Sequence, residues 1–159
     1  MSKKPAKTNA LRELDAAGIA HECHFLETDH ALSGVEAAEA LGQDPACVFK
    51  TLVTQGKSGG HYVFMVPVAE ELDLKKAAVA VGEKAVAMIP QRDLLPLTGY
   101  VHGGCSPIGM KKQFPTVIDE TAQLFDEVSF SGGRIGCQLT MAPDALDQMV
   151  GLSYADIVK

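Results

Sequence analysis

The sequence contains no apolar run long enough to cross a membrane. A spanning helix needs about 20 consecutive apolar residues, and no hydrophobic stretch in this chain of 159 residues approaches that length. The basic start, MSKKPAKTNA, lacks the apolar segment that a secretory signal peptide requires. We therefore expect a cytoplasmic protein with no membrane partner.

An excess of basic residues is also missing. The chain has 14 Lys and Arg against 20 Asp and Glu, a net charge of -6 and an isoelectric point near 5.3. A broad nucleic-acid-binding surface usually shows as a basic excess, so this balance disfavours such a surface, and we expect no DNA partner. It still allows a small basic pocket on an acidic body.

Motifs for metals, redox chemistry and nucleotides are absent as well. No CxxC and no HExxH occurs, and neither a Walker motif nor GxGxxG is found. His21 and His24 are three residues apart in an expected strand, where their side chains would point to opposite faces. We expect no metal and no cofactor. The four cysteines are expected to be free thiols that mostly pack in the core: Cys23, Cys47, Cys105 and Cys137.

The composition is that of one ordinary globular domain. Hydrophobic residues make up 47% and charged residues 21% of the chain, which is sufficient for a core. No repeat, low-complexity segment or linker divides it. We expect a single domain over residues 1–159.

Local patterns predict alternating strands and helices without a regular βαβ rhythm. Ser33 and Glu36 form a capping box, and Asp73 and Gly82 bracket a helix. GKSGG reads as a hairpin loop between two strands. Helices are expected over residues 8–17, 33–42, 74–81, 90–95 and 143–150, and strands over 19–26, 48–54, 61–68, 85–88, 116–119, 127–130 and 137–141. The predicted fold class is α/β, a compact, barrel-like mixed sheet with peripheral helices.

Lys50 lies in the middle of the apolar strand VFKTLV. Because an unpaired buried charge is costly, its ammonium group must reach a polar environment. It either extends to water from a half-exposed strand or points into a pocket to hold a phosphate, hydroxyl or carboxylate.

Two glycine-rich segments offer backbone N–H groups to a ligand. In HGGCSPIG, residues 102–109, adjacent glycines allow a tight turn that can form an anion site or an oxyanion hole. An ordinary turn explains the same residues. SGGRIG, residues 131–136, adds a hydroxyl and the charge of Arg134, and a hairpin turn explains it equally well. Cys105 would need a lowered pKa and a nearby base to be a nucleophile, so packing is the favoured interpretation.

Five short motifs occur in this chain in an order and at spacings that are specific when taken together, although each motif is weak alone. They are FKTL, LDLKKAA, TGYVHGGCSPIGMKK, PTVID and VSFSGGRIG. In this combination the chain resembles the YbaK/EbsC family of aminoacyl-tRNA deacylases, which are related to the editing domain of prolyl-tRNA synthetase. The resemblance implies a metal-independent hydrolase that deacylates mischarged aminoacyl-tRNA in trans, typically Cys-tRNA(Pro), with the substrate's own thiol attacking its ester.

The resemblance also implies roles for individual residues. Lys50 would hold the tRNA 3′ end, and the backbone amides of the catalytic pair Gly103 and Gly104 would stabilise the oxyanion. The remaining matched positions would contact the substrate: Leu26, Ser106, Pro107, Gly109, Ser131 and Gly132.

Two departures from the family pattern affect substrate choice. In His24–Asp29, Leu26 stands where relatives carry a tyrosine, and Gln138 stands near the position of a family carboxylate. Deacylation of another small aminoacyl group such as alanine is therefore an alternative. Further alternatives are a non-catalytic module that binds tRNA or a synthetase, and a regulatory protein. Because the chain is acidic and would contact only the 3′ end of the tRNA, we expect its affinity for bare tRNA to be weak and salt-sensitive. We also expect a partner such as prolyl-tRNA synthetase to help it capture the substrate.

Overall fold

The computed structural model describes residues 7–26 and 33–159. Residues 1–6 of the basic start, and Glu27, Thr28 and Asp29 of the segment compared with the family, lie outside the described residues. In chain order the elements are α1 (Asn9–Ala17), β1 (Glu22–Phe25), α2 (Gly34–Ala40), η1 (Pro45–Cys47), β2 (Phe49–Gly56), β3 (His61–Pro67), α3 (Leu74–Val81), β4 (Val86–Met88), α4 (Gln91–Thr98), β5 (Thr116–Asp119), η2 (Glu120–Leu124), β6 (Val128–Ser131), β7 (Cys137–Met141), α5 (Pro143–Val150) and β8 (Leu152–Ala155).

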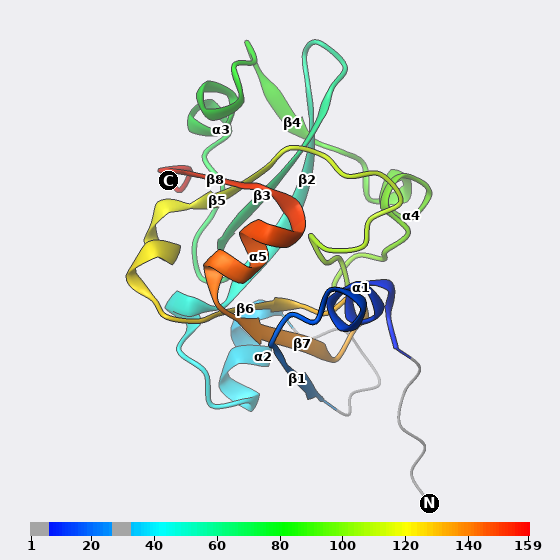
Figure 1. Ribbon diagram of the computed structural model, residues 1–159. Coiled ribbons are helices and arrows are strands. Elements are labelled where there is room, and N and C mark those ends of the chain that lie inside the picture. The colour runs from blue at the N-terminus through cyan, green and yellow to red at the C-terminus, as the bar shows by residue number, and fades with distance from the viewer. Residues whose placement is uncertain (1–6, 27–32) are drawn as a thin grey trace, which may run out of the picture.

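The strands form two sheets. One has the order β1-β7-β6 and is antiparallel throughout. The other has the order β4-β2-β3-β5-β8, in which β3, β5 and β8 run parallel and the remaining pairs are antiparallel. A bridge from Val48 to Ser129 joins the start of β2 to β6. The expected barrel-like mixed sheet with peripheral helices is confirmed (Figure 1).

Most of the predicted elements have the expected type, and several have the expected bounds. Helix α3 begins after Asp73, whose carboxylate accepts from the N–H groups of Lys75 and Lys76, and ends at Gly82 with φ at 73°. The capping box of Ser33 and Glu36 opens α2. These signals are local, and each provides a partner for a backbone group that a helix end leaves unpaired.

Several predicted boundaries differ from the observed ones by one or two residues, and two differ by three. The first strand was expected from Ile19 but begins at Glu22, because the N–H of Ile19 donates to Leu14 and so closes the end of α1 after Gly18. Helix α4 continues past Leu95 to Thr98, although Pro96 lies inside it. Thr98 is buried and its hydroxyl donates to the carbonyl of Leu94.

The hydrophobic core lies between and around the sheets. One cluster joins α1 and α5 to both sheets through Leu14, Leu146, Phe130 and Met65. A second cluster covers β3 with α3, and a third packs α4 and the glycine-rich loop against β2 and β3. This third cluster places the loop that follows α4 beside Val53 in β2.

Candidate functional site

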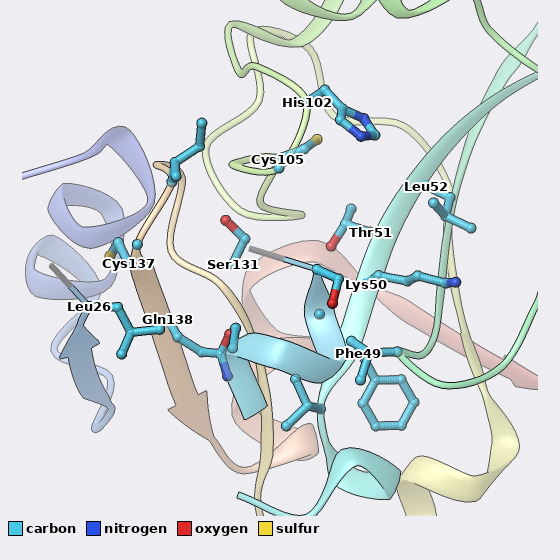
Figure 2. Close-up of a pocket in the computed structure, with 18 of the residues that line it drawn as sticks. Leu26, Phe49, Lys50, Thr51, Leu52, His102, Cys105, Ser131, Cys137 and Gln138 are labelled. Carbon is cyan, nitrogen blue, oxygen red and sulfur yellow. The ribbon is translucent and has the colours of Figure 1, made fainter. Parts of the chain in front are cut away.

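A cavity of about 260 Å³ opens where the two sheets meet. Its walls come from the start of β2, the beginning of α2, the loop after α4 and the turn between β6 and β7 (Figure 2). The lining residues are Leu26, Ser33, Gly34, Ala37, Val48, Phe49, Lys50, Thr51, Leu52, Val68, Leu94, His102, Gly103, Cys105, Ser131, Ile135, Gly136, Cys137 and Gln138.

Lys50 lines this cavity from β2, where it pairs with Val66 of β3. The residue is half-buried, and none of the described residues forms a hydrogen bond or ion pair with its ammonium group. Lys50 therefore contributes to the lining of the cavity, and its role in holding the tRNA 3′ end stays a prediction. Figure 2 shows Lys50 and Leu52 leaving β2 on one side and Thr51 leaving on the other.

Thr51 supplies the polar group on that other side, toward Ser131 and Cys105 (Figure 2). Its Oγ1 atom is buried and has no hydrogen-bond partner among the described residues. An unpaired buried hydroxyl costs about 1–3 kcal/mol of folding free energy. The position is thus favourable for a ligand that donates to or accepts from this hydroxyl. Sequence reasoning missed Thr51, although side-chain alternation next to Lys50 could have indicated it.

Only part of the predicted oxyanion pair faces the cavity. Gly103 lines it with φ at 85°, and no described carbonyl accepts from its N–H group. Gly104 does not line it, and its N–H group donates to the carbonyl of Val101 at 3.0 Å. In this structure the N–H group of Gly104 is thus engaged by Val101, and its role in an oxyanion hole stays a prediction.

The other predicted site residues of the loop, Ser106, Pro107 and Gly109, do not line the cavity. Ser106 is fully buried and its Oγ accepts from the N–H of Ile108, and Pro107 is buried beside it. A β-carbon on Gly109 would lie 2.7 Å from Tyr100 Oη and 2.9 Å from the backbone nitrogen of Ala10. The structure thus gives these residues a packing role, and direct contact with a substrate stays a prediction.

Two predicted substrate contacts do lie on the wall. Leu26 lines the cavity, and its N–H donates to the carbonyl of Gly136 at 2.7 Å. Ser131 lines it as well, with its Oγ accepting from the N–H of Gly133 at 3.2 Å. Gly132, next to Ser131, is buried and does not line the cavity. It packs so closely against Cys137 that a β-carbon on it would lie 2.4 Å from Cys137 Sγ.

The cysteine thiols on the wall are poor nucleophiles. Burial raises the pKa of Cys105 from its ordinary value of 9.0 to about 12, and burial also raises the pKa of Cys137 to about 12. A thiol with such a pKa carries almost no thiolate at neutral pH. The packing interpretation of Cys105 agrees with this environment.

The described ranges, 7–26 and 33–159, hold no group of three or more His, Cys, Asp or Glu side chains arranged for a metal ion. Nδ1 of His21 lies 2.8 Å from its neighbour Ile19's carbonyl oxygen, and His24 lies 3.5 Å from Glu22. None of the helices in the same ranges combines the length and apolar composition that a membrane crossing needs.

Comparison with known proteins gives one consistent family. The family model described as the aminoacyl-tRNA editing domain matches residues 28–149. The chain belongs to the aminoacyl-tRNA editing domain family. Within this family it is 43% identical to EbsC of Enterococcus faecalis, whose name proposes a Cys-tRNA(Pro)/Cys-tRNA(Cys) deacylase, over 99% of this chain and 98% of that protein.

Solved structures share the fold of this chain. A protein described as a candidate trans-editing enzyme for prolyl tRNA synthetase is 28% identical, covers 98% of this chain and 99% of its own, and superposes with a TM-score of 0.84. A hypothetical protein at 24% identity covers 96% of this chain and 100% of its own, with a TM-score of 0.87, and supports the fold alone.

Proposed function

We propose that this editing domain is a trans-acting aminoacyl-tRNA deacylase, which hydrolyses the ester between a mischarged amino acid and the 3′ end of its tRNA. The observation that carries the proposal is the cavity itself. It joins an apolar wall to a cation at Lys50, a free hydroxyl at Thr51 and the N–H of Gly103. The names of EbsC and of the candidate trans-editing enzyme support the same activity.

Positioning is the main chemical task in this reaction. The aminoacyl ester is already an activated acyl group, so modest catalysis is sufficient. Lys50 would hold an oxygen of the terminal nucleotide through its ammonium group, as a charge-assisted hydrogen bond. The N–H of Gly103 would donate to the carbonyl oxygen as negative charge develops on it.

For a cysteinyl ester, the substrate supplies its own nucleophile. Its sulfur bonds to the carbonyl carbon, the bond from that carbon to the ribose oxygen breaks, and the thiol proton ends on the ribose hydroxyl. The products are free tRNA and a cyclic thioester of cysteine, which water then opens. Holding the thiol against its own carbonyl uses proximity, and no side chain of the protein needs to become a nucleophile.

The preferred aminoacyl group is the finer part of the proposal. We place cysteine first because EbsC, at 43% identity, is named for it. Alanine is the second candidate, because Leu26 and Gln138 depart from the family pattern on the cavity wall. A hydrophobic pocket discriminates between side chains that differ by one methylene by only about 1–3 kcal/mol of binding free energy. The ratio of kcat/KM for the two substrates must therefore be measured.

A substrate panel tests this function. Purified protein is incubated with Cys-tRNA(Pro), Ala-tRNA(Pro), Ser-tRNA(Pro) and Cys-tRNA(Cys), and loss of the labelled aminoacyl group is followed. We expect Cys-tRNA(Pro) to be deacylated fastest, with the same rate in the presence of a chelator because the reaction needs no metal. Rates equal to buffer for all four substrates would refute the proposal, and saturable binding without turnover would indicate a binding module.

We further propose that prolyl-tRNA synthetase assists capture of the substrate. The net charge of -6 opposes tight binding of bare tRNA, and the 28% identical neighbour is described as acting for that synthetase. Addition of catalytically inactive synthetase should lower the KM for Cys-tRNA(Pro) and leave kcat unchanged. An unchanged KM at physiological salt would contradict this assistance.

A further inference from the structure

Gln138 is a buried polar residue on the cavity wall. It is 9% exposed, lies in β7 and pairs with Ser131 of β6. Figure 2 shows its amide oxygen turned upward into the space below Ser131 and its nitrogen turned the opposite way.

Gln43 holds this amide from outside the cavity. The Nε2 of Gln138 donates to the Oε1 of Gln43 at 2.5 Å. The Nε2 of Gln43 donates in turn to Thr140 Oγ1 at 3.4 Å, and this hydroxyl lies 2.7 Å from Ser129 Oγ. The side-chain nitrogen of Gln138 therefore has its hydrogen-bond partner outside the cavity, and its side-chain oxygen can accept a hydrogen bond from a ligand.

The charge of the substrate gives that oxygen a partner. An α-aminoacyl ester carries an ammonium group, and no Asp or Glu lines the cavity within the described residues. The hydroxyls of Ser33 and Ser131 already accept from the backbone N–H groups of Glu36 and Gly133. The Thr51 hydroxyl both donates and accepts, whereas the amide oxygen of Gln138 can only accept, which suits a cationic donor.

We propose that Gln138 accepts a hydrogen bond from the α-ammonium group of the aminoacyl ester, and that Gln43 is the positioning residue that keeps the oxygen of Gln138 turned toward it. This inference rests on the proposed function, because the ammonium group belongs to the aminoacyl ester. It gives the site a neutral acceptor for the amino group on the wall formed by β7.

Binding of two non-hydrolysable analogues tests the proposal. One is adenosine with cysteine in amide linkage at the 3′ position, and the other carries 3-mercaptopropionate, which lacks only the α-amino group. Their dissociation constants are measured by calorimetry. The wild-type protein should prefer the amino compound by about tenfold or more, the effect of one charge-assisted hydrogen bond.

Substitutions assign that preference to the two glutamines. Gln138→Met and Gln43→Met should each lose most of the preference. Gln43→Glu should retain it, because a carboxylate can only accept and so still binds the nitrogen of Gln138. Gln55→Met, on the exposed end of β2, is the matched control and should bind as wild type. A wild-type protein without the preference, or an unchanged preference in either methionine variant, would overturn the inference.

A parallel turnover assay with Cys-tRNA(Pro) separates the two proposals. If the wild type prefers the amino compound through Gln43 and Gln138 but does not turn over Cys-tRNA(Pro), the deacylase function is refuted and the recognition of the amino group by Gln138 is supported. Turnover by the wild type together with an unchanged preference in the methionine variants would refute the recognition alone.

Discussion

The backbone of Gly104 lies directly against the backbone of Arg134. A β-carbon on Gly104 would be 2.9 Å from the carbonyl carbon of Arg134 and 2.9 Å from the nitrogen of Ile135. Two glycine-rich segments that are distant in the sequence thus meet at one point, and the contact holds the loop with Gly103 against the turn with Ser131.

Gly104→Ala should weaken both stability and turnover. Backbone atoms cannot move aside as a flexible side chain can, so we expect a cost of about 1–3 kcal/mol and a lower thermal midpoint, with a reduced kcat/KM because the cavity wall shifts. Thermal unfolding and deacylation assays measure the two effects. Gly60→Ala is the control, since a β-carbon there would meet side-chain atoms alone, the nearest being the Tyr62 hydroxyl at 3.3 Å. A Gly104→Ala variant as stable and active as Gly60→Ala would contradict the packing argument.

Thr51→Val should separate stability from activity. The Thr51 hydroxyl is buried without a partner among the described residues, so its replacement by a methyl group should leave the unfolding free energy unchanged or raise it slightly. If the hydroxyl contacts the substrate, kcat/KM should fall by about tenfold, as expected for one lost hydrogen bond in a dry site.

The matched control for this change is Thr54→Val in the same strand. Thr54 is fully buried and its hydroxyl donates to the carbonyl of Tyr62 at 3.1 Å. We expect this variant to lose stability because the Tyr62 carbonyl loses a donor. Full activity in Thr51→Val would exclude Thr51 from substrate binding.

Lys50→Ala should lower kcat/KM for Cys-tRNA(Pro) by roughly 10- to 100-fold, the range for loss of a hydrogen bond from a charged group. Its fold should persist, because none of the described residues pairs with the Lys50 ammonium group. Lys57→Ala, an exposed lysine of the β2–β3 hairpin, is the control for a general loss of positive charge. Equal losses in the two variants would mean that Lys50 acts only through the overall charge.

Stability should fall at alkaline pH. Burial raises the pKa of Cys105 and Cys137 from 9.0 to about 12 in the folded chain, and burial also raises the pKa of the Tyr100 hydroxyl above its usual value of 10.0. Each group keeps its proton in the folded state while the unfolded chain releases it. The contribution of these groups to the free energy of unfolding is therefore complete below pH 9 and is lost as the pH rises toward 12.

Urea unfolding at several pH values measures this loss. Each group contributes at most about 1.4 kcal/mol per pH unit, so Cys105→Ala should show a shallower decline than wild type between pH 9 and pH 12. The slopes of unfolding free energy against pH are compared between the two proteins, because the substitution also changes the unfolding free energy at neutral pH. Identical slopes would show that the Cys105 thiol ionises in the folded chain.

Local signals in the sequence were sufficient for much of the fold. The strand over Thr116–Asp119, the strand over Cys137–Met141 and the helix over Pro143–Val150 were predicted with the observed bounds. In each case the determinants lie within the segment: a run of β-branched and apolar residues, or a proline at the first helical position. The resemblance to the editing family, confirmed by the comparisons, placed Lys50, Gly103, Ser131 and Leu26 near one cavity.

Contacts between distant segments were beyond such reasoning. Nothing near Gly104 in the sequence indicates that its N–H group is engaged by Val101 or that its α-carbon meets Arg134. The pairing of Gln43 with Gln138 likewise joins the end of α2 to β7, 95 residues apart. Such contacts depend on how the two sheets are brought together, and that arrangement is a property of the whole chain.

The bridge between Val48 and Ser129 has a consequence for the way the site discriminates. Val48 lines the cavity, and its bridge ties the five-stranded sheet to the three-stranded one at the point where they would have to separate. The cavity cannot widen by splaying of its walls without breaking that link. We therefore expect an oversized aminoacyl group to be excluded by its size, because this link opposes widening of the cavity.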